Sequence, residues 1–295
     1  MTTYEEFKEK ILEKAEEEME GRATIRTVQK NNGVKLDALV IMSMESNVSP
    51  SIYLNSYYKE YMECTDREGA LDEIWKEIKC TYFNHLPNEN LNTDFLYDFD
   101  RVRGRIHMKI VSMEKNEELL EQLAYVPYLD LAVVFAVAMS LEESVNATIT
   151  VRKEFLECWG VDETELWKVA CENMAGDYEL ISMSKIIAAR MGKSEEPELD
   201  PNLYILTNHS KAQGAVTMVQ PGVLCHAAEE LSAERLVILP SSVHEVLLVV
   251  ADVEMDMSHF NNMVREVNSS EVMPEEVLSD HVYVYDRESD EVKIA

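Results

Sequence analysis

Residues Ser241–Glu245 (Ser-Ser-Val-His-Glu) carry the side chains that nucleophilic catalysis requires. A serine nucleophile needs a histidine base within hydrogen-bond reach, and an acid that orients this base. In an extended segment, Ser242 and His244 lie on one face and Glu245 on the other, so the acid would come from elsewhere in the chain. Ser242 and His244 are therefore the catalytic candidates. The structural alternative is that the serines shape the turn after Pro240 while His244 ends a strand.

A metal site is the second kind of chemistry that the sequence allows. His226 and Glu230 are four residues apart on a predicted helix, so both project from one face. Together with His244 they would form a set of two histidines and one carboxylate, which zinc or iron accepts. The H-E-x-x-H spacing that would make a ligand assignment strong is absent. A solvated His-Glu pair is the preferred interpretation, so no metal and no cofactor are predicted.

A run of basic residues is the third candidate. Arg101, Arg103, Arg105, His107 and Lys109 alternate with apolar residues and glycine, a period that predicts a strand with one basic face. Arginine suits bidentate contact with phosphate or carboxylate, so Arg101, Arg103, Arg105 and Lys109 are the predicted ligand- or partner-binding residues. Alternatively, this face neutralises the chain's own Glu-rich helices, such as residues 5–20.

These side chains must be positioned by helices and strands. Thr3 and Glu6 form a capping box that predicts a helix over residues 3–20. Asn31–Gly33 predicts a hairpin between strands 23–29 and 34–43, and Asp162 predicts the start of a helix. The other expected helices are residues 51–62, 68–83, 114–123, 223–231 and 257–267, and Thr65 is expected to cap the second of them. The other expected strands are residues 131–139, 147–152, 203–207, 236–239, 245–250 and 282–285. The predicted class is α+β, with mixed sheets and packed helices.

The expected organisation has three parts in one compact body. Residues 1–100 hold the first helix, the hairpin and two further helices, and residues 101–195 and 196–295 form two halves. Residues 123–137 and 236–250 share a pattern of strand, proline and strand, followed by a helix. This pattern raises the possibility of a duplicated strand–strand–helix unit. Residues 193–201, charged and proline-bearing, are the expected linker.

Composition narrows the class of protein. The chain has 295 residues, with 27 Lys and Arg against 56 Asp and Glu, for a net charge of −29. Such a charge opposes direct binding to a nucleic acid backbone. The five scattered cysteines predict free thiols in a reducing compartment. No apolar run approaches the ~20 residues of a membrane span, and the N-terminus does not resemble a signal peptide. A cytoplasmic protein without membrane contact is predicted, with its oligomeric state open.

A family resemblance is carried by residues 31–34, 49–55, 204–208, 214–215, 239–245, 263–268 and 277–280. These stretches resemble a family of bacterial proteins known as domain of unknown function 5688. Residues 239–245 (Leu-Pro-Ser-Ser-Val-His-Glu) are the most specific part of this resemblance, and a more distant likeness to domain of unknown function 1444 rests on the same run. Neither family implies an established activity, so the resemblance implies a bacterial setting and no chemistry.

Two functions remain open at this point. The preferred hypothesis is a non-enzymatic interaction or regulatory protein that engages a basic protein partner through its acidic surface, as an acidic mimic of nucleic acid would. The alternative is a hydrolase, either serine-dependent or metal-dependent, with a site around Asn208 to Glu245. The charge and the lack of a convincing catalytic constellation favour the first, and the concentration of polar residues between positions 208 and 245 favours the second.

Overall fold

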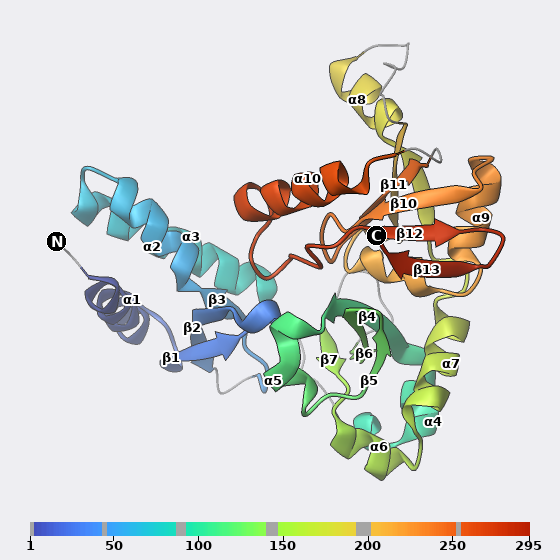
Figure 1. The fold of residues 1–295 in the computed structure, drawn as a ribbon. Coiled ribbons are helices and arrows are strands. Elements are labelled where there is room, and N and C mark those ends of the chain that lie inside the picture. Colours follow the sequence, from blue (N-terminus) through green and yellow to red (C-terminus); the bar gives the residue numbers. More distant parts are fainter. Residues whose placement is uncertain (1–2, 43–45, 87–92, 140–146, 193–201, 252–254) are drawn as a thin grey trace. The chain divides into compact units, whose positions relative to one another are not determined.

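The computed structural model describes residues 3–42, 46–86, 93–139, 147–192, 202–251 and 255–295 of the chain. Its contacts divide the chain into two compact units, whose helices and strands are labelled in Figure 1. Unit 1 contains residues 1–30 and 34–94, and unit 2 contains residues 31–33 and 95–295. Both combine helices with antiparallel sheets, which confirms the predicted α+β class. Within the described ranges, no helix is long and apolar enough to cross a membrane.

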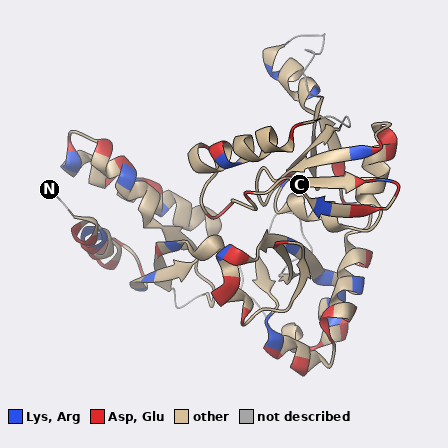
Figure 2. Cartoon of the chain, viewed as in Figure 1, with Lys and Arg blue, Asp and Glu red and all other residues tan. Residues whose placement is uncertain are grey.

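Unit 1 packs helices against an antiparallel sheet of order β1-β2-β3. The predicted capping box is confirmed, because the Thr3 hydroxyl accepts the N–H of Glu6 and the Glu6 carboxylate accepts the N–H of Thr3. Behind this cap, Phe7, Ile11 and Ala15 form the buried stripe of α1. Figure 2 shows the acidic residues along the same helix. The elements of unit 1 are α1 (Tyr4–Glu18), β1 (Arg22–Gln29), β2 (Lys35–Met42), β3 (Ser51–Tyr53), α2 (Leu54–Glu63) and α3 (Arg67–His85).

Two sequence predictions in unit 1 are corrected by long-range pairing and by a different cap. The helix expected from residue 51 begins at Leu54, because Ser51–Tyr53 pairs with β2 as a short edge strand. The helix expected to be capped by Thr65 is capped by Asp66, whose carboxylate accepts the N–H of Gly69. The predicted hairpin is confirmed: Gln29 lies opposite Lys35 across the turn.

The smaller sheet of unit 2 is centred on β6. This strand is buried along nearly its whole length, as an uninterrupted apolar run predicts, and it pairs antiparallel with three strands. The helix predicted over residues 114–123 is shorter than expected and consists of η4 (Glu114–Asn116) and α5 (Glu117–Leu120). The strands are β4 (Ile106–Ser112), β5 (Tyr125–Tyr128), β6 (Leu131–Ala138) and β7 (Thr148–Thr150).

The larger sheet of unit 2 has the order β13-β12-β10-β11-β9-β8. Phe260 and Val264 of α10 pack on one face, against Val237, Leu239 and Val249. The sequence pattern missed β8 and α8. The elements are β8 (Glu179–Ser182), α8 (Met183–Met191), β9 (Leu203–Thr207), α9 (Val223–Glu230), β10 (Arg235–Leu239), β11 (Val246–Val250), α10 (Met257–Ser270), β12 (Tyr283–Asp286) and β13 (Glu291–Ile294).

The segment between the sheets of unit 2 is a 3-10 stretch, η5 (Gly214–Val219), in which every residue is buried. It packs against β4, β9 and α9. Helix α7 (Glu163–Asn173) packs on β4 and follows α6 (Lys153–Trp159), which the sequence pattern missed. The predicted cap of α7 is confirmed, because the Asp162 carboxylate accepts the N–H of Glu165.

The predicted basic strand is wrong over residues 101–105 and confirmed from Ile106 onward, where His107 and Lys109 alternate with buried residues of β4. Arg101 lies in α4 (Phe99–Val102), Arg103 and Arg105 lie in η3 (Arg103–Arg105), and β4 begins only at Ile106. A helical turn forms here because the Asp98 carboxylate caps it by accepting the N–H of Asp100. The basic residues therefore do not share one strand face.

The predicted duplication is not tested by these contacts, although the two proline-containing segments differ locally. Pro127 lies within β5 and pairs with Ala132, whereas Pro240 follows β10 and leads into a turn. The expected linker, residues 193–201, lies outside the described residues.

Candidate functional site

The turn from Pro240 to Glu245, which we call the histidine turn, joins β10 to β11 and lines a pocket of about 420 Å³. Its two serine hydroxyls are both engaged. The Oγ of Ser242 accepts the N–H of His244 at 3.0 Å and donates to the Glu245 carboxylate at 3.3 Å. The Oγ of Ser241 donates to the same carboxylate oxygen at 3.3 Å. Each hydroxyl therefore stabilises the turn itself.

The imidazole of His244 is also engaged on both nitrogens. Its Nδ1 accepts the backbone N–H of Gln213 at 3.2 Å, and its Nε2 lies 3.3 Å from the Glu276 carboxylate. An acceptor at Nδ1 places the ring proton on Nε2, which donates to Glu276. The carbonyl of His244 accepts the hydroxyl of Thr207 at 2.8 Å. Through its imidazole and its carbonyl, His244 therefore links the histidine turn to the loop that follows β9.

That loop approaches the histidine turn so closely that it requires glycine at one position. A Cβ on Gly214 would lie 2.6 Å from the backbone N of Asn208 and 2.7 Å from the carbonyl of His244, and would also meet the Thr207 hydroxyl. The amide of Asn208 holds the loop by donating to the carbonyl of Ala212 at 3.0 Å and accepting its N–H at 3.2 Å. The histidine turn and this loop are therefore one interlocked polar structure.

The two catalytic candidates are adjacent but are not joined. Among the described contacts, no hydrogen bond links the Ser242 hydroxyl to the His244 ring, because each is bonded to other groups. His209, which follows Asn208, bonds to Asp177 at 2.7 Å and takes no part in the histidine turn. The hydrolase alternative stays a prediction without a supporting contact.

The metal candidates do not come together in the described part of the chain. No group of three His, Cys, Asp or Glu residues there has an arrangement that could hold an ion. His226 of α9 is instead bonded through Nδ1 to the hydroxyl of Tyr178 at 2.9 Å, and His244 takes part in the histidine turn. Glu230 is exposed near the end of α9.

Three of the four predicted binding residues use their side chains for contacts within unit 2. Arg103 lies 3.5 Å from the Glu172 carboxylate, Arg105 donates to the carbonyl of Met139 at 3.1 Å, and Lys109 donates to the hydroxyl of Thr148 at 2.8 Å. Burial lowers the pKa of Lys109 below its ordinary value. No contact of Arg101 with a side chain is among those described. A binding role for these four residues remains a prediction.

A turn that the sequence interpretation did not single out lies between η5 and α9. The N–H of Val223 donates to the carbonyl of Gln220 at 3.2 Å, and Gly222 has φ 79° and ψ −9°. Proline followed by glycine in this geometry is a type II turn, in which the glycine position needs positive φ. We call residues Gln220–Val223 the Gln220 turn.

The side chain of Gln220 is unlike the other buried amide of the site. It is only 7% exposed, yet its Nε2 is buried without a hydrogen-bond partner. Leaving a buried donor unsatisfied costs about 1–3 kcal/mol. The residue lines two pockets, one on each side of its turn. The Gln220 turn therefore combines a buried, unsatisfied amide nitrogen with a residue position that both pockets share.

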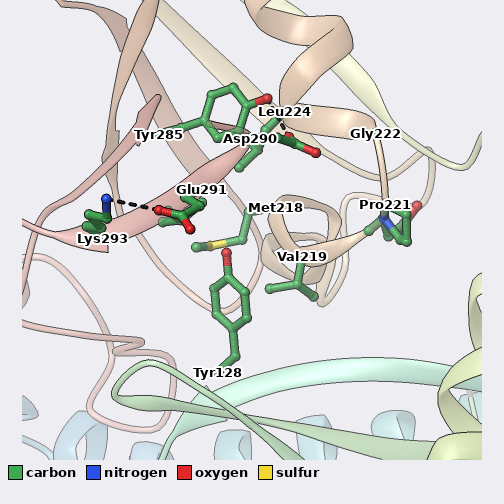
Figure 3. Close-up of a pocket in the computed structure, with 12 residues that line it drawn as sticks. Tyr128, Met218, Val219, Pro221, Gly222, Leu224, Tyr285, Asp290, Glu291 and Lys293 are labelled. Atoms are coloured by element: carbon green, nitrogen blue, oxygen red, sulfur yellow. Dashed lines mark hydrogen bonds and ion pairs between the residues drawn. The ribbon is translucent and has the colours of Figure 1, made fainter. Parts of the chain in front are cut away.

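The first of these is the acidic pocket, of about 490 Å³, shown in Figure 3. The hairpin β12–β13 contributes the two carboxylates. The hydroxyl of Tyr285 donates to Asp290 at 2.7 Å, and Glu291 pairs with the exposed Lys293 at 2.9 Å. Tyr128 and Met218 face this hairpin across the pocket (Figure 3).

The titration of the tyrosines reflects the charge of the acidic pocket. Burial, and then the negative charge of Asp290, raise the pKa of Tyr128 to about 12. Burial and the hydrogen bond to Asp290 also raise the pKa of Tyr285. Burial disfavours a charge of either sign, but the contribution of Asp290 to both shifts means that its carboxylate disfavours a further negative charge and favours a cation. Carboxylates beside aromatic rings suit an ammonium or guanidinium group.

The second is the acid-free pocket, of about 380 Å³, on the other side of the Gln220 turn. Its lining includes Cys171, Tyr178 and His226, and contains no Asp or Glu among the described residues. Burial raises the pKa of the Cys171 thiol, which disfavours a reactive thiolate. The absence of carboxylates from this lining contrasts with the acidity of the chain as a whole.

The sequence contains signals for only part of these two pockets. The Pro221-Gly222 dipeptide is a recognisable turn signal, and the residues from Asp252 to the C-terminus include 12 acidic and only 3 basic side chains. Neither observation reveals that Gln220 is buried, because its neighbours come from distant segments such as Tyr285 and Tyr178.

Comparison with known proteins gives a family but no activity. No curated protein and no solved structure matches the chain. The model of the family of unknown function DUF5688 matches residues 4–287, which is nearly the whole length. The chain therefore belongs to the DUF5688 family.

Proposed function

We propose that this protein is a non-enzymatic interaction protein that binds a basic protein partner, and that the acidic pocket receives a lysine or arginine side chain of that partner. The observation that carries the proposal is the pairing of Asp290 and Glu291 with two tyrosines and a methionine around one pocket. Acidic, aromatic and thioether groups together match a long side chain that is apolar along its stem and positive at its end.

In this proposal, each group of the pocket contacts a different part of such a side chain. Its methylene stem packs against Met218 and the ring of Tyr128, and a cation near a tyrosine face gains about 0.5–1 kcal/mol at an exposed site. The charged end pairs with Asp290 and Glu291. Lys293 now pairs with Glu291, but both side chains are more than half exposed, so this pair is weak and a partner can displace it.

The charge of the surrounding segment supports the same partner. The residues from Asp252 onward carry 12 acidic against 3 basic side chains. Such an excess raises the local concentration of cations and the rate of encounter with a basic partner. It also opposes direct binding to nucleic acid, whose phosphates carry the same sign of charge.

The test is the binding of a fluorescently labelled lysine-rich peptide, followed by anisotropy in low and high salt. In the double variant Asp290→Asn, Glu291→Gln we expect about tenfold weaker binding, because two partly exposed ion pairs contribute about 0.5–1 kcal/mol each. Asn suits position 290, where φ is 53°, and it keeps an acceptor for Tyr285.

The matched control is Glu288→Gln, which removes an exposed carboxylate of the same hairpin that does not line the pocket. We expect its affinity to stay within about twofold of the parent. Equal losses in the control and the double variant would show that only the general charge matters. Unchanged binding of a fully lysine-acetylated peptide would contradict the proposal outright.

A further inference from the structure

We infer that the outer edge of strand β1 (Arg22–Gln29) is a docking site for an extended acidic segment of a partner protein, which adds to the sheet of unit 1 as a further strand. The site lies in unit 1, so it does not depend on the acidic pocket of unit 2 or on the proposed function. Three features of the described residues support it: backbone groups without partners, two arginines without ion pairs, and a local excess of basic residues.

The first feature is the backbone of β1, which is an end strand of the sheet β1-β2-β3 (Figure 1). The N–H of Lys30 donates to the carbonyl of Val34, and this bond fixes which residues of β1 face β2. Because every second residue of an antiparallel pair has the same orientation, residues 22, 24, 26 and 28 bond to β2, and residues 23, 25, 27 and 29 direct their N–H and C=O groups outward. Among the described contacts, these outward N–H groups have no partner. Such a row of groups is a template for a further strand.

The second feature is the pair of arginines on this strand. Ala23 and Ile25 pack into the core beside α1, so alternation places Arg22 and Arg26 on the opposite face of the sheet. Both arginines are exposed, and neither takes part in an ion pair among the described residues. The carboxylate of the neighbouring strand, Asp37, is bonded on the α1 face to Thr27 at 2.7 Å and to Lys8 at 2.9 Å.

The third feature is the composition of the segment. Residues 21–36 include the basic residues Arg22, Arg26, Lys30 and Lys35 and no Asp or Glu, although the whole chain has 27 Lys and Arg against 56 Asp and Glu. Lys30 lies over the ring of Tyr53 at 4.2 Å, and Lys35 is exposed. The charge of this edge is therefore complementary to an acidic strand, and complementary charge favours encounter with such a partner.

The register of an added strand brings acidic side chains to the two arginines. Relative to an antiparallel newcomer, Arg22 and Arg26 occupy the positions that do not exchange backbone hydrogen bonds, where facing side chains approach most closely. The two arginines are four residues apart, or about 13 Å along the strand. Two carboxylates four residues apart on the partner can therefore each face one arginine.

The same arginines oppose pairing with a second copy of this chain. Another β1 would bring its own Arg22 and Arg26 to this edge, and like charges that face each other across a strand pair are destabilising. Charged residues on an edge strand are a common means of preventing self-association. An acidic strand turns this repulsion into attraction, which is why the partner is acidic.

The test uses a labelled seven-residue peptide, acetyl-Thr-Glu-Val-Thr-Val-Glu-Thr-amide, whose binding is followed by anisotropy. Its glutamates stand at the second and sixth positions, opposite Arg26 and Arg22 in the antiparallel register. We expect saturable binding that weakens with salt, and about tenfold weaker binding in the double variant Arg22→Gln, Arg26→Gln. The control is Lys10→Gln, Lys59→Gln, which removes the same charge from exposed positions of α1 and α2. We expect its affinity to stay within about threefold of the parent.

Peptides with a single N-methyl group test the role of the backbone without altering the protein. In the antiparallel register, the third N–H of the peptide faces β1 and the fourth faces away. Methylation of the third nitrogen should weaken binding at least about tenfold, because main-chain hydrogen bonds give strand addition its affinity. Methylation of the fourth should leave it within about threefold of the parent peptide.

Amide hydrogen exchange, resolved by NMR, locates the bound peptide. Binding should slow exchange at residues 23, 25 and 27, which direct their N–H groups outward, and should change little at residues 24 and 26, which are already bonded to β2. Lack of saturable binding, equal losses in the two double variants, or equal effects of the two methyl groups would overturn the inference. Equally tight binding of octa-uridylate would also overturn it, since the edge would then attract any polyanion.

Discussion

The histidine turn and the Gln220 turn are both polar turns of unit 2, but they differ in how their hydrogen bonds are used. In the histidine turn, the Ser242 hydroxyl and both ring nitrogens of His244 have partners. In the Gln220 turn, a buried amide nitrogen has none. The difference teaches that residue types associated with catalysis can be fully occupied by structure. A buried polar group that is left unsatisfied is the exception that needs an explanation.

A second contrast lies within the Gln220 turn itself. The hairpin β12–β13 places two carboxylates on one side, and α7 and α9 place none on the other. Two pockets that share residues of this turn thus differ in the charged side chains that line them. The three predictions below test the contrast between the turns and then that between the pockets.

The largest expected effect comes from closing the space around the histidine turn with Gly214→Ala. The added Cβ would lie 2.6–2.7 Å from two backbone atoms that cannot move independently. We expect the free energy of unfolding to fall by about 3 kcal/mol or more, as overpacking against rigid groups does, measured by urea denaturation. Gly104→Ala is the control, because a Cβ there meets no atom within 4 Å. Equal stability of the two variants would contradict the interlocked geometry.

The next prediction compares the buried amides of Asn208 and Gln220, whose replacement should change stability in opposite directions. Asn208→Ala removes an amide that donates to Ala212 and accepts from Ala212 and Ser210, so we expect a loss of about 1–3 kcal/mol. Gln220→Met replaces an unsatisfied amide by an apolar chain of similar length. We expect it to stabilise the protein by up to about 1 kcal/mol in the absence of ligand.

Both variants are measured by urea denaturation in a buffer without phosphate or carboxylate ions. A loss of stability in Gln220→Met similar to that in Asn208→Ala would mean that the Gln220 amide has a partner, and the contrast between the turns would fail.

The sequence predicted those features of the fold that depend on neighbouring residues. The caps at Thr3 and Asp162 are local hydrogen bonds, so residue type and spacing suffice to find them. The prediction of a basic strand failed over residues 101–105 because another local hydrogen bond, the helix cap at Asp98, outweighed an alternation of basic and apolar residues that extends over only a few positions. The strand order β13-β12-β10-β11-β9-β8 could not be predicted from the sequence, since it depends on pairings between distant segments.

The site was less accessible from sequence than the fold. The serines bond to Glu245 within the same turn, but whether the ring of His244 is free depends on Gln213 and Glu276, about thirty residues away. The acidic pocket combines Tyr128 with Asp290, which no local pattern connects. Periodicity and motif spacing describe what a residue could do, and tertiary contacts decide which of its atoms remain available.

The smallest effect is a shift in titration that measures the field in the acidic pocket. The charge of Asp290 contributes to the raised pKa of Tyr128, after burial. Asp290→Asn should therefore lower this pKa from about 12 while leaving it above the ordinary value of about 10, because burial persists. Tyrosinate absorbance near 295 nm is followed against pH, and subtraction of the Tyr128→Phe curve isolates Tyr128.

The same shift has a consequence for stability, with a defined sign. Tyr128 keeps its proton in the folded chain at a pH where the unfolded chain has lost it, so its contribution is complete below pH ~10 and is lost between about 10 and 12. Asp290→Asn narrows that window, and Glu288→Gln should leave it unchanged. If Asp290→Asn leaves the titration of Tyr128 where it was, the carboxylate does not set the potential of the pocket. The difference in charged lining between the two pockets would then have no effect on the titration of a residue that lines one of them.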